Sequence, residues 1–185
     1  MARLPSLAAA VLLVAGLCAA DVAKADDGLA LERAIKATFL SKFELYVTWP
    51  ERSFASAASP FRLCVVGVDD TFADLIARAA VGQSAGGHAI VVVRLPAASG
   101  NDGCELLFIP MNDAETVRLQ LAAVDRLPVL TVTDGMRDGS AKGIVNFVIL
   151  NNRVRFEIDD ATAVRSGLAI SSKLLSLAVS VRPVP

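Results

Sequence analysis

The chain has 185 residues, of which 54% are hydrophobic and 20% are charged, and its formal net charge at pH 7 is −1. This balance produces no strong field of either sign, which argues against nucleic acid and anionic membranes as partners. The part of the chain after residue 25 has the length of one domain and is long enough to bury a core without metals or many disulfides.

The first 25 residues have the order of a secretory signal peptide. Arg3 gives a positive start, an apolar run extends from Leu7 to Ala20, and Ala23-Lys24-Ala25 supplies a small-x-small cleavage site. The run is shorter than the roughly 20 apolar residues that span a bilayer. We therefore predict a cleaved signal peptide over 1–25 and an exported, periplasmic domain over 26–185, with no direct insertion into the membrane.

Hydrophobic periodicity predicts the elements that follow. Apolar residues at helical spacing predict a helix over Leu29–Val47, which Pro50 ends. The next predicted elements are strands over 61–68, 89–95, 104–109 and 128–132, a turn over 82–87, and helices over 71–80 and 112–124, the last capped by Asn112. Strands that alternate with helices predict a three-layer α/β domain with a mainly parallel sheet.

The pattern changes after residue 142. Strands are predicted over 143–150 and 153–158, separated by Asn151-Asn152, a pair that tolerates the positive φ of a tight hairpin turn. Helices are predicted over 161–167 and 171–181, and no linker or internal repeat interrupts the chain. The sequence thus predicts a single α/β domain that ends in a β-hairpin and two closing helices.

Two cysteines remain once Cys18 is removed with the signal peptide. Cys64 and Cys104 form an even pair in an oxidising compartment, which favours a disulfide; two buried free thiols are the alternative. Neither cysteine belongs to a CxxC motif, so a thioredoxin-type redox centre is not predicted.

Motifs that carry chemistry are missing from the sequence. It contains no P-loop, no GxGxxG, no GxSxG and no S-x-x-K spacing. The only histidine, His88, cannot build a multi-histidine metal site and is expected to be a polar residue at a strand end. The pairs Asp69-Asp70 and Asp159-Asp160 are expected to cap helices and form turns. We therefore expect no catalytic residue, no metal, no cofactor and no enzyme activity.

Several segments together resemble the YfiR family of periplasmic proteins, in the same order and over nearly the whole of residues 26–185. These segments are Ile35–Phe43 with Thr48-Trp49-Pro50, Phe61–Gly67, Cys104–Ile109, Val129–Asp134, Val154–Asp159 and Ser166–Ala178. No single segment is specific, whereas their joint order is. The chain departs from the family pattern in three places. Many relatives have Cys-His at Cys104-Glu105 and Asn at Asp159, and the second cysteine pair of the best-known member has no counterpart here.

The resemblance implies a small, often dimeric α/β protein that binds the periplasmic domain of an inner-membrane diguanylate cyclase and holds the cyclase inactive. Such a repressor lowers cyclic di-GMP and biofilm formation. A homodimer is expected, and redox control that depends on two disulfides is not expected to carry over. Tyr46 and Trp49 are interface candidates because tyrosine and tryptophan are favoured anchors. Arg155 and Glu157 are further candidates for the dimer or partner surface, since they share one face of a strand; a merely solvated face is the alternative.

A second hypothesis belongs to a different class of function. A periplasmic module for a small ligand would use the crevice at the carboxyl ends of the parallel strands. The residues expected to line this crevice are Asp69, Asp70, Asn112 and Asp134.

Overall fold

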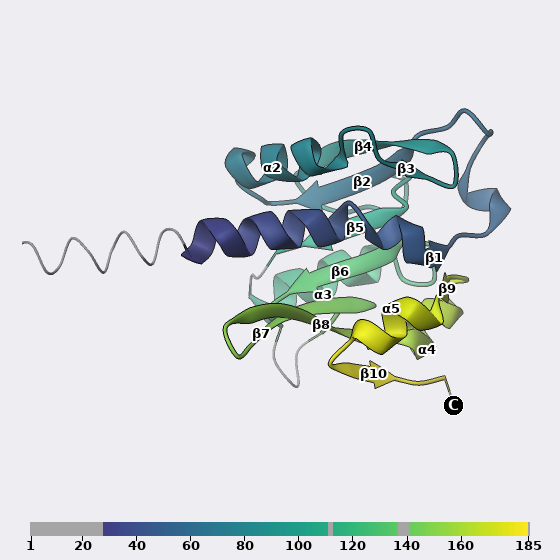
Figure 1. Ribbon diagram of the computed structural model, residues 1–185. Helices are drawn as coiled ribbons and strands as arrows, with labels where there is room; N and C mark the ends of the chain where they lie inside the picture. The colour runs from purple at the N-terminus through teal and green to yellow at the C-terminus, as the bar shows by residue number, and fades with distance from the viewer. Residues whose placement is uncertain (1–27, 111–112, 137–140, 185) are drawn as a thin grey trace, which may run out of the picture.

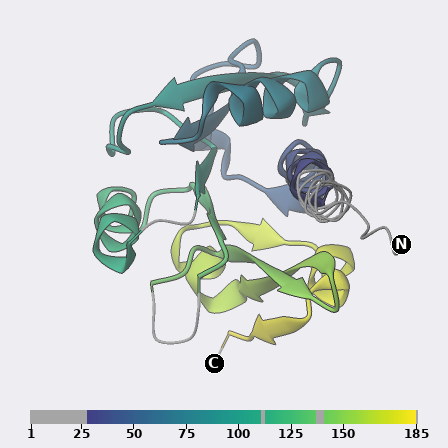
Figure 2. The same cartoon turned by 90° about the vertical axis from the view of Figure 1, so that its left-hand side faces the viewer.

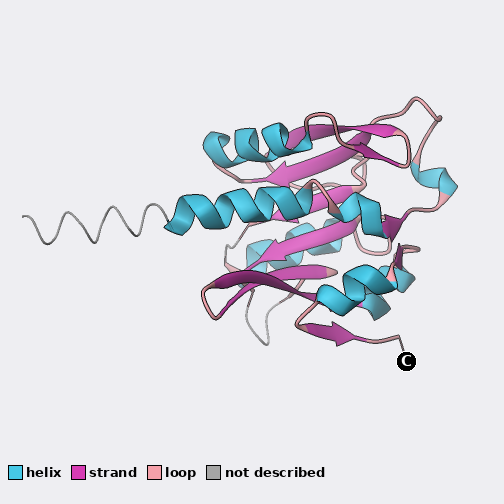
Figure 3. Ribbon diagram, in the orientation of Figure 1, coloured by secondary structure: helices cyan, strands magenta, loops and turns pink. Residues whose placement is uncertain are grey.

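The computed structural model describes residues 28–110, 113–136 and 141–184; the predicted signal peptide and Asn112 lie outside these ranges. The described residues form an eight-stranded sheet with helices on both faces, in agreement with the predicted α/β domain and its mainly parallel sheet (Figures 1 and 3). The strands are β1 (Val47–Thr48), β2 (Phe61–Val66), β3 (Ser84–Ala85), β4 (His88–Leu95), β5 (Leu106–Ile109), β6 (Leu130–Asp134), β7 (Val145–Leu150), β8 (Arg153–Asp159), β9 (Ala169–Ile170) and β10 (Ser180–Arg182). The helices are a first helix over residues 28–40, then η1 (Phe43–Tyr46), η2 (Glu51–Ser53), α2 (Asp70–Ala80), α3 (Ala114–Ala123), α4 (Asp160–Arg165) and α5 (Ser172–Leu177).

The strand order is β10-β8-β7-β6-β5-β2-β4-β3. The five central strands, from β7 to β4, are parallel, so their carboxyl ends meet at one edge of the sheet. The antiparallel β8 follows β7 through a tight turn in which Asn151 and Asn152 have φ of 50° and 58°, as predicted for this hairpin. Strands β1 and β9 form a separate two-stranded sheet.

Helices lie on both sides of the sheet (Figure 2), and a separate hydrophobic core lies between the sheet and the helices of each side. The larger core packs the first helix, α2 and α5 against the sheet, and phenylalanines dominate its centre, where the rings of Phe43 and Phe156 meet edge to face with centroids 5.6 Å apart. The smaller core packs α3 against β2 and β5 through Val117 and Leu107. Among the described residues, no helix is long and apolar enough to cross a membrane.

The prediction of one helix over Leu29–Val47 is wrong at its carboxyl end. The α-helix ends at Leu40, a 3-10 turn follows in η1, and Val47 enters strand β1. Val47 pairs with Ile170 in β9, so long-range pairing of a β-branched residue outweighs the helical spacing of the apolar residues.

The prediction of a closing helix over 171–181 is also wrong in part. Helix α5 ends at Leu177, and Ser180–Arg182 pair in parallel with β8 as the edge strand β10. Val179 donates its backbone N–H to the Phe156 oxygen at 2.9 Å, because the edge of β8 offers hydrogen bonds that a helix would leave unused. The N-cap of α3 is Asp113, which accepts a hydrogen bond from the Thr116 amide, and this role was predicted for Asn112.

Candidate functional site

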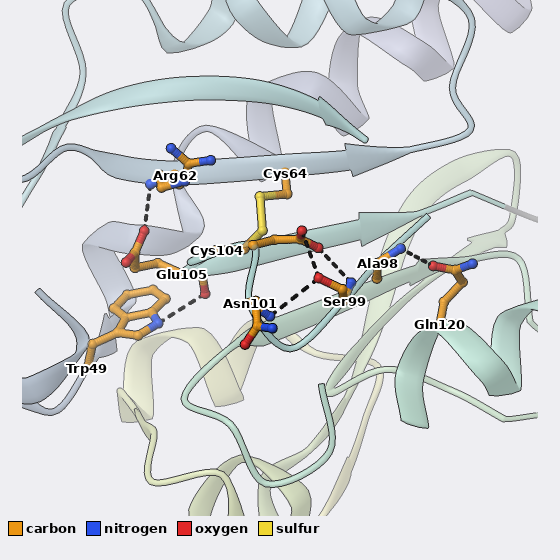
Figure 4. The surroundings of a disulfide bond; sticks show 10 residues. Trp49, Arg62, Cys64, Ala98, Ser99, Asn101, Cys104, Glu105 and Gln120 are labelled. Atoms are coloured by element: carbon orange, nitrogen blue, oxygen red, sulfur yellow. Dashed lines mark hydrogen bonds between the residues drawn. A yellow bond between two sulfur atoms is a disulfide. The ribbon is translucent and has the colours of Figure 1, made fainter. Parts of the chain in front are cut away.

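The Cys64–Cys104 disulfide predicted from the sequence is present and joins β2 to the segment that leads into β5 (Figure 4). The two Cα atoms lie 5.9 Å apart, within the range that suits a disulfide. Cys64 is fully buried in the smaller core and Cys104 is half-buried beside it. The chain segment between the two cysteines contains α2, β3 and β4, and the bridge adds a covalent link between the neighbouring strands β2 and β5.

Hydrogen bonds fix the loop that precedes Cys104 (Figure 4). Asp102 accepts hydrogen bonds from the Ser99 amide at 2.6 Å and from the Ser99 hydroxyl at 2.9 Å. The Ala98 amide donates to the side-chain oxygen of Gln120 on α3. The half-buried Cys104 therefore follows a loop that hydrogen bonds hold in place and connect to α3.

Glu105, which departs from the family pattern, has a structural role in this chain. Its buried carboxylate accepts a hydrogen bond from the Arg62 amide at 2.6 Å, and its backbone oxygen accepts one from the Trp49 indole at 3.0 Å (Figure 4). Burial raises the pKa of Glu105, and the hydrogen bond from the Arg62 amide opposes that rise. Trp49, an interface candidate, is thus half-buried and also packs edge to face on Phe61, with ring centroids 5.0 Å apart.

Asp159, where the resemblance leads one to expect asparagine, caps α4. Its carboxylate accepts hydrogen bonds from the Thr162 amide at 2.9 Å and from Arg182 of β10 at 3.1 Å. The Asp159 side chain therefore both caps the N-terminus of α4 and forms an ion pair with the edge strand β10. An asparagine would accept the cap bond but would lose the ion pair with Arg182.

The four interface candidates lie in two separate places. Tyr46 and Trp49 are half-buried and pack against the larger core. Arg155 and Glu157 share the opposite face of β8, because Phe156 between them belongs to the larger core. The structure therefore does not bring the four candidates together into one surface.

Arg155 and Glu157 share a face of β8 without pairing with each other. Glu157 instead accepts hydrogen bonds from Lys142 at 2.8 Å and from Asn146 at 3.3 Å. Arg155 is exposed and makes no ion pair with any described residue. The half-buried Glu157 is thus held by contacts within the chain, whereas Arg155 is exposed to solvent.

Three of the four crevice candidates, Asp69, Asp70 and Asp134, lie at the carboxyl edge of the sheet, where the first helix contacts two of them, and Asn112 is outside the described residues. Asp69 caps α2 through the Phe72 amide and pairs with Arg33 at 2.9 Å, and both contacts lower the pKa of Asp69, that from Phe72 more. Asp134 pairs with Lys36 at 2.7 Å, although burial raises the pKa of Asp134 overall. Asp70 is exposed, with its nearest described cation, Arg94, at 3.8 Å.

Lys36 is a central residue of this edge that the sequence interpretation did not single out. Its side chain is only 6% exposed and contacts both Glu32 and Asp134. The signal was present in the spacing, since Lys36 lies three and seven positions before the inward-facing Phe39 and Phe43. Within the described part of the chain, no group of three or more His, Cys, Asp or Glu side chains could hold a metal ion.

Comparison with protein-family models matches residues 33–179 to the family described as YfiR/HmsC-like. The chain belongs to the YfiR/HmsC-like family. The match covers every strand of the eight-stranded sheet except the edge strand β10, and it agrees with the resemblance seen in the sequence. No curated protein matches the chain at a significant level. Members of this family are periplasmic and regulatory rather than catalytic, and are associated with cyclic di-GMP signalling.

Proposed function

We propose that this protein is a periplasmic repressor that binds the periplasmic domain of an inner-membrane diguanylate cyclase and holds the cyclase inactive. The observation that carries the proposal is the family match over residues 33–179. Release of the repressor would raise cyclic di-GMP in the cytoplasm and favour biofilm formation. Repression requires that the protein bind the inactive conformation of the cyclase better than the active one, because only differential affinity shifts an equilibrium.

The exposed face of the β7–β8 hairpin supports a docking role. Cross-strand pairing places Leu150 opposite Arg153, and Val148 opposite Arg155, on the same face as Glu157. We call these five residues the hairpin surface. The smaller core that α3 covers on this face contains no residue of β7 or β8.

The chemistry of the hairpin surface is that of an interface anchor. Leu150 is 50% exposed, and Arg153 and Arg155 are exposed beside it. Arginine is enriched among residues whose truncation weakens a complex, and its fork suits bidentate contact with a carboxylate. We therefore propose that the hairpin surface contacts an acidic surface, either on the cyclase or in a homodimer. In this proposal Glu157 positions β8 through its hydrogen bond with Lys142.

The test is inhibition of cyclic di-GMP synthesis in isolated membranes that contain the cyclase and are opened to admit the protein on the periplasmic side. The unmodified protein, produced from the full chain with its signal peptide, should lower the rate of cyclic di-GMP synthesis. The variant R155E should lose most of this inhibition. The matched control is R78E, which reverses an exposed arginine on α2 far from the hairpin. Charge reversal at Glu157 should also weaken binding; if R155E and E157K both inhibit like the unmodified protein, the hairpin surface is not the docking site.

A further inference from the structure

A pocket of about 470 Å³ lies at the amino edge of the sheet, where β4 begins at His88. Segments from η1, β1, η2 and the β3–β4 turn line it, including Glu44, Trp49, Glu51, Phe54 and His88. We call it the Glu44 pocket. Its volume falls within the range of small-molecule sites.

Glu44 is the unexplained group of this pocket. The residue is 5% exposed, and neither carboxylate oxygen has a hydrogen-bond partner among the described residues. Burial raises the pKa of Glu44 to about 7, and the smaller opposing effects of its own backbone amide and of Lys42 do not offset this rise. A buried carboxylate without a donor is costly, and each such group in a folded protein calls for an explanation.

The charges around the pocket are mostly acidic. Among the described residues no lysine or arginine lines the pocket, and Glu51 adds a second acidic group at its exposed margin. His88 is the only basic residue among the described residues of the lining. Its ring stacks on Phe54 with centroids 3.9 Å apart, and its Nδ1 lies 2.6 Å from the Ser59 oxygen. The pocket thus combines negative charge with aromatic walls, the combination that recognises organic cations.

We propose that the Glu44 pocket binds a small organic ammonium ion whose N–H groups donate to the Glu44 carboxylate and whose carbon stem lies against Trp49 and Phe54. A primary ammonium supplies both the charge and the donors that this carboxylate lacks. Because the two oxygens are covered from solvent, we expect the Glu44 side chain to rotate toward the pocket when the cation binds. The site lies apart from the hairpin surface, and its occupancy does not depend on the cyclase.

The experiment is isothermal titration of the isolated protein at pH 8 with n-butylammonium, with 1-butanol as a neutral probe of matched length. We expect a dissociation constant on the order of 1 mM for the ammonium, a scale reasonable for so few atoms, and at least tenfold weaker binding of the alcohol. The variant E44Q should lose the ammonium preference at least tenfold. Gln nearly keeps the size of Glu, so the pocket itself is retained.

Protonation provides a second readout. With Glu44 titrating near pH 7, the affinity for butylammonium should fall about 30-fold from pH 8 to pH 5.5, and this fall should be absent in E44Q. The control E115Q removes an exposed carboxylate that is paired with Arg118 on α3 and should change nothing. Equal binding of the ammonium and the alcohol, unchanged affinity in E44Q, or no heat of binding at 50 mM would each overturn the proposal. Because no partner is present, these outcomes are independent of the repressor function.

Discussion

Replacing Glu44 by glutamine should stabilise the protein above neutral pH. Glu44 is buried, its carboxylate has no hydrogen-bond partner in the described part of the chain, and burial raises its pKa from 4.5 to about 7. The folded state therefore binds this proton more tightly than the unfolded chain, and the stability from protonated Glu44 is complete below pH 4.5 and is lost as pH rises through 7. A pKa difference from 4.5 to about 7, at 1.36 kcal/mol per unit, means that ionised Glu44 lowers the free energy of unfolding by about 3 kcal/mol at pH 8. E44Q has no group that ionises here and should not show this loss.

The assay is urea unfolding between pH 4 and pH 8, followed by the fluorescence of Trp49, the chain's only tryptophan. The free energy of unfolding of E44Q minus that of the unmodified protein should rise from near zero at pH 4 to about 3 kcal/mol at pH 8. The control E51Q changes an exposed carboxylate of the same pocket and should stay within about 0.5 kcal/mol at every pH. Parallel pH profiles for E44Q and the unmodified protein would refute the reasoning, because they would mean that Glu44 does not titrate differently on folding.

Three further changes test other parts of the structure. The double variant C64A/C104A removes a bridge between residues 40 apart and should lower the free energy of unfolding by about 4 kcal/mol in chain-entropy terms, and reductant should then have no further effect on its urea midpoint. K36M leaves the Asp134 carboxylate in place without its cation and should cost about 3 kcal/mol at pH 7. Because burial already raises the pKa of Asp134, this loss should shrink as pH falls and the carboxyl becomes protonated, and an equal loss at pH 4 and pH 7 would contradict the ion pair. W49F keeps the aromatic packing on the core but removes the indole donor to the Glu105 oxygen, so thermal unfolding should show a loss of about 1 kcal/mol.

Local patterns in the sequence were sufficient to predict most of the fold. Alternation in Arg153–Asp159 and the Asn151-Asn152 turn define the hairpin, because a two-residue period and a tolerated positive φ are local properties. The disulfide was predicted from an even pair of cysteines in an oxidising compartment, and the Cys64–Cys104 bridge in the structure confirms it. The family was indicated by the order of its segments and is confirmed by the match over 33–179.

Features that depend on distant partners were not accessible from the sequence. Val47 and Ser180–Arg182 become strands only because β9 and the open edge of β8 lie beside them. Glu44 lies on an exposed-looking polar position of a helical pattern, yet the 3-10 turn of η1 directs it into the protein. Asp69 and Asp134 were expected to line a crevice, and only the packing of the first helix shows that they pair with Arg33 and Lys36.

The central claim is that this protein represses a diguanylate cyclase, and the most direct measurement is cellular cyclic di-GMP in strains that lack the gene. The account predicts that deletion raises cyclic di-GMP and biofilm formation, and that a plasmid encoding the full chain with its signal peptide restores both. Deletion of the partner cyclase as well should abolish the rise. Unchanged cyclic di-GMP in the deletion strain, or a rise that persists when every inner-membrane cyclase with a periplasmic domain is removed, would contradict the account.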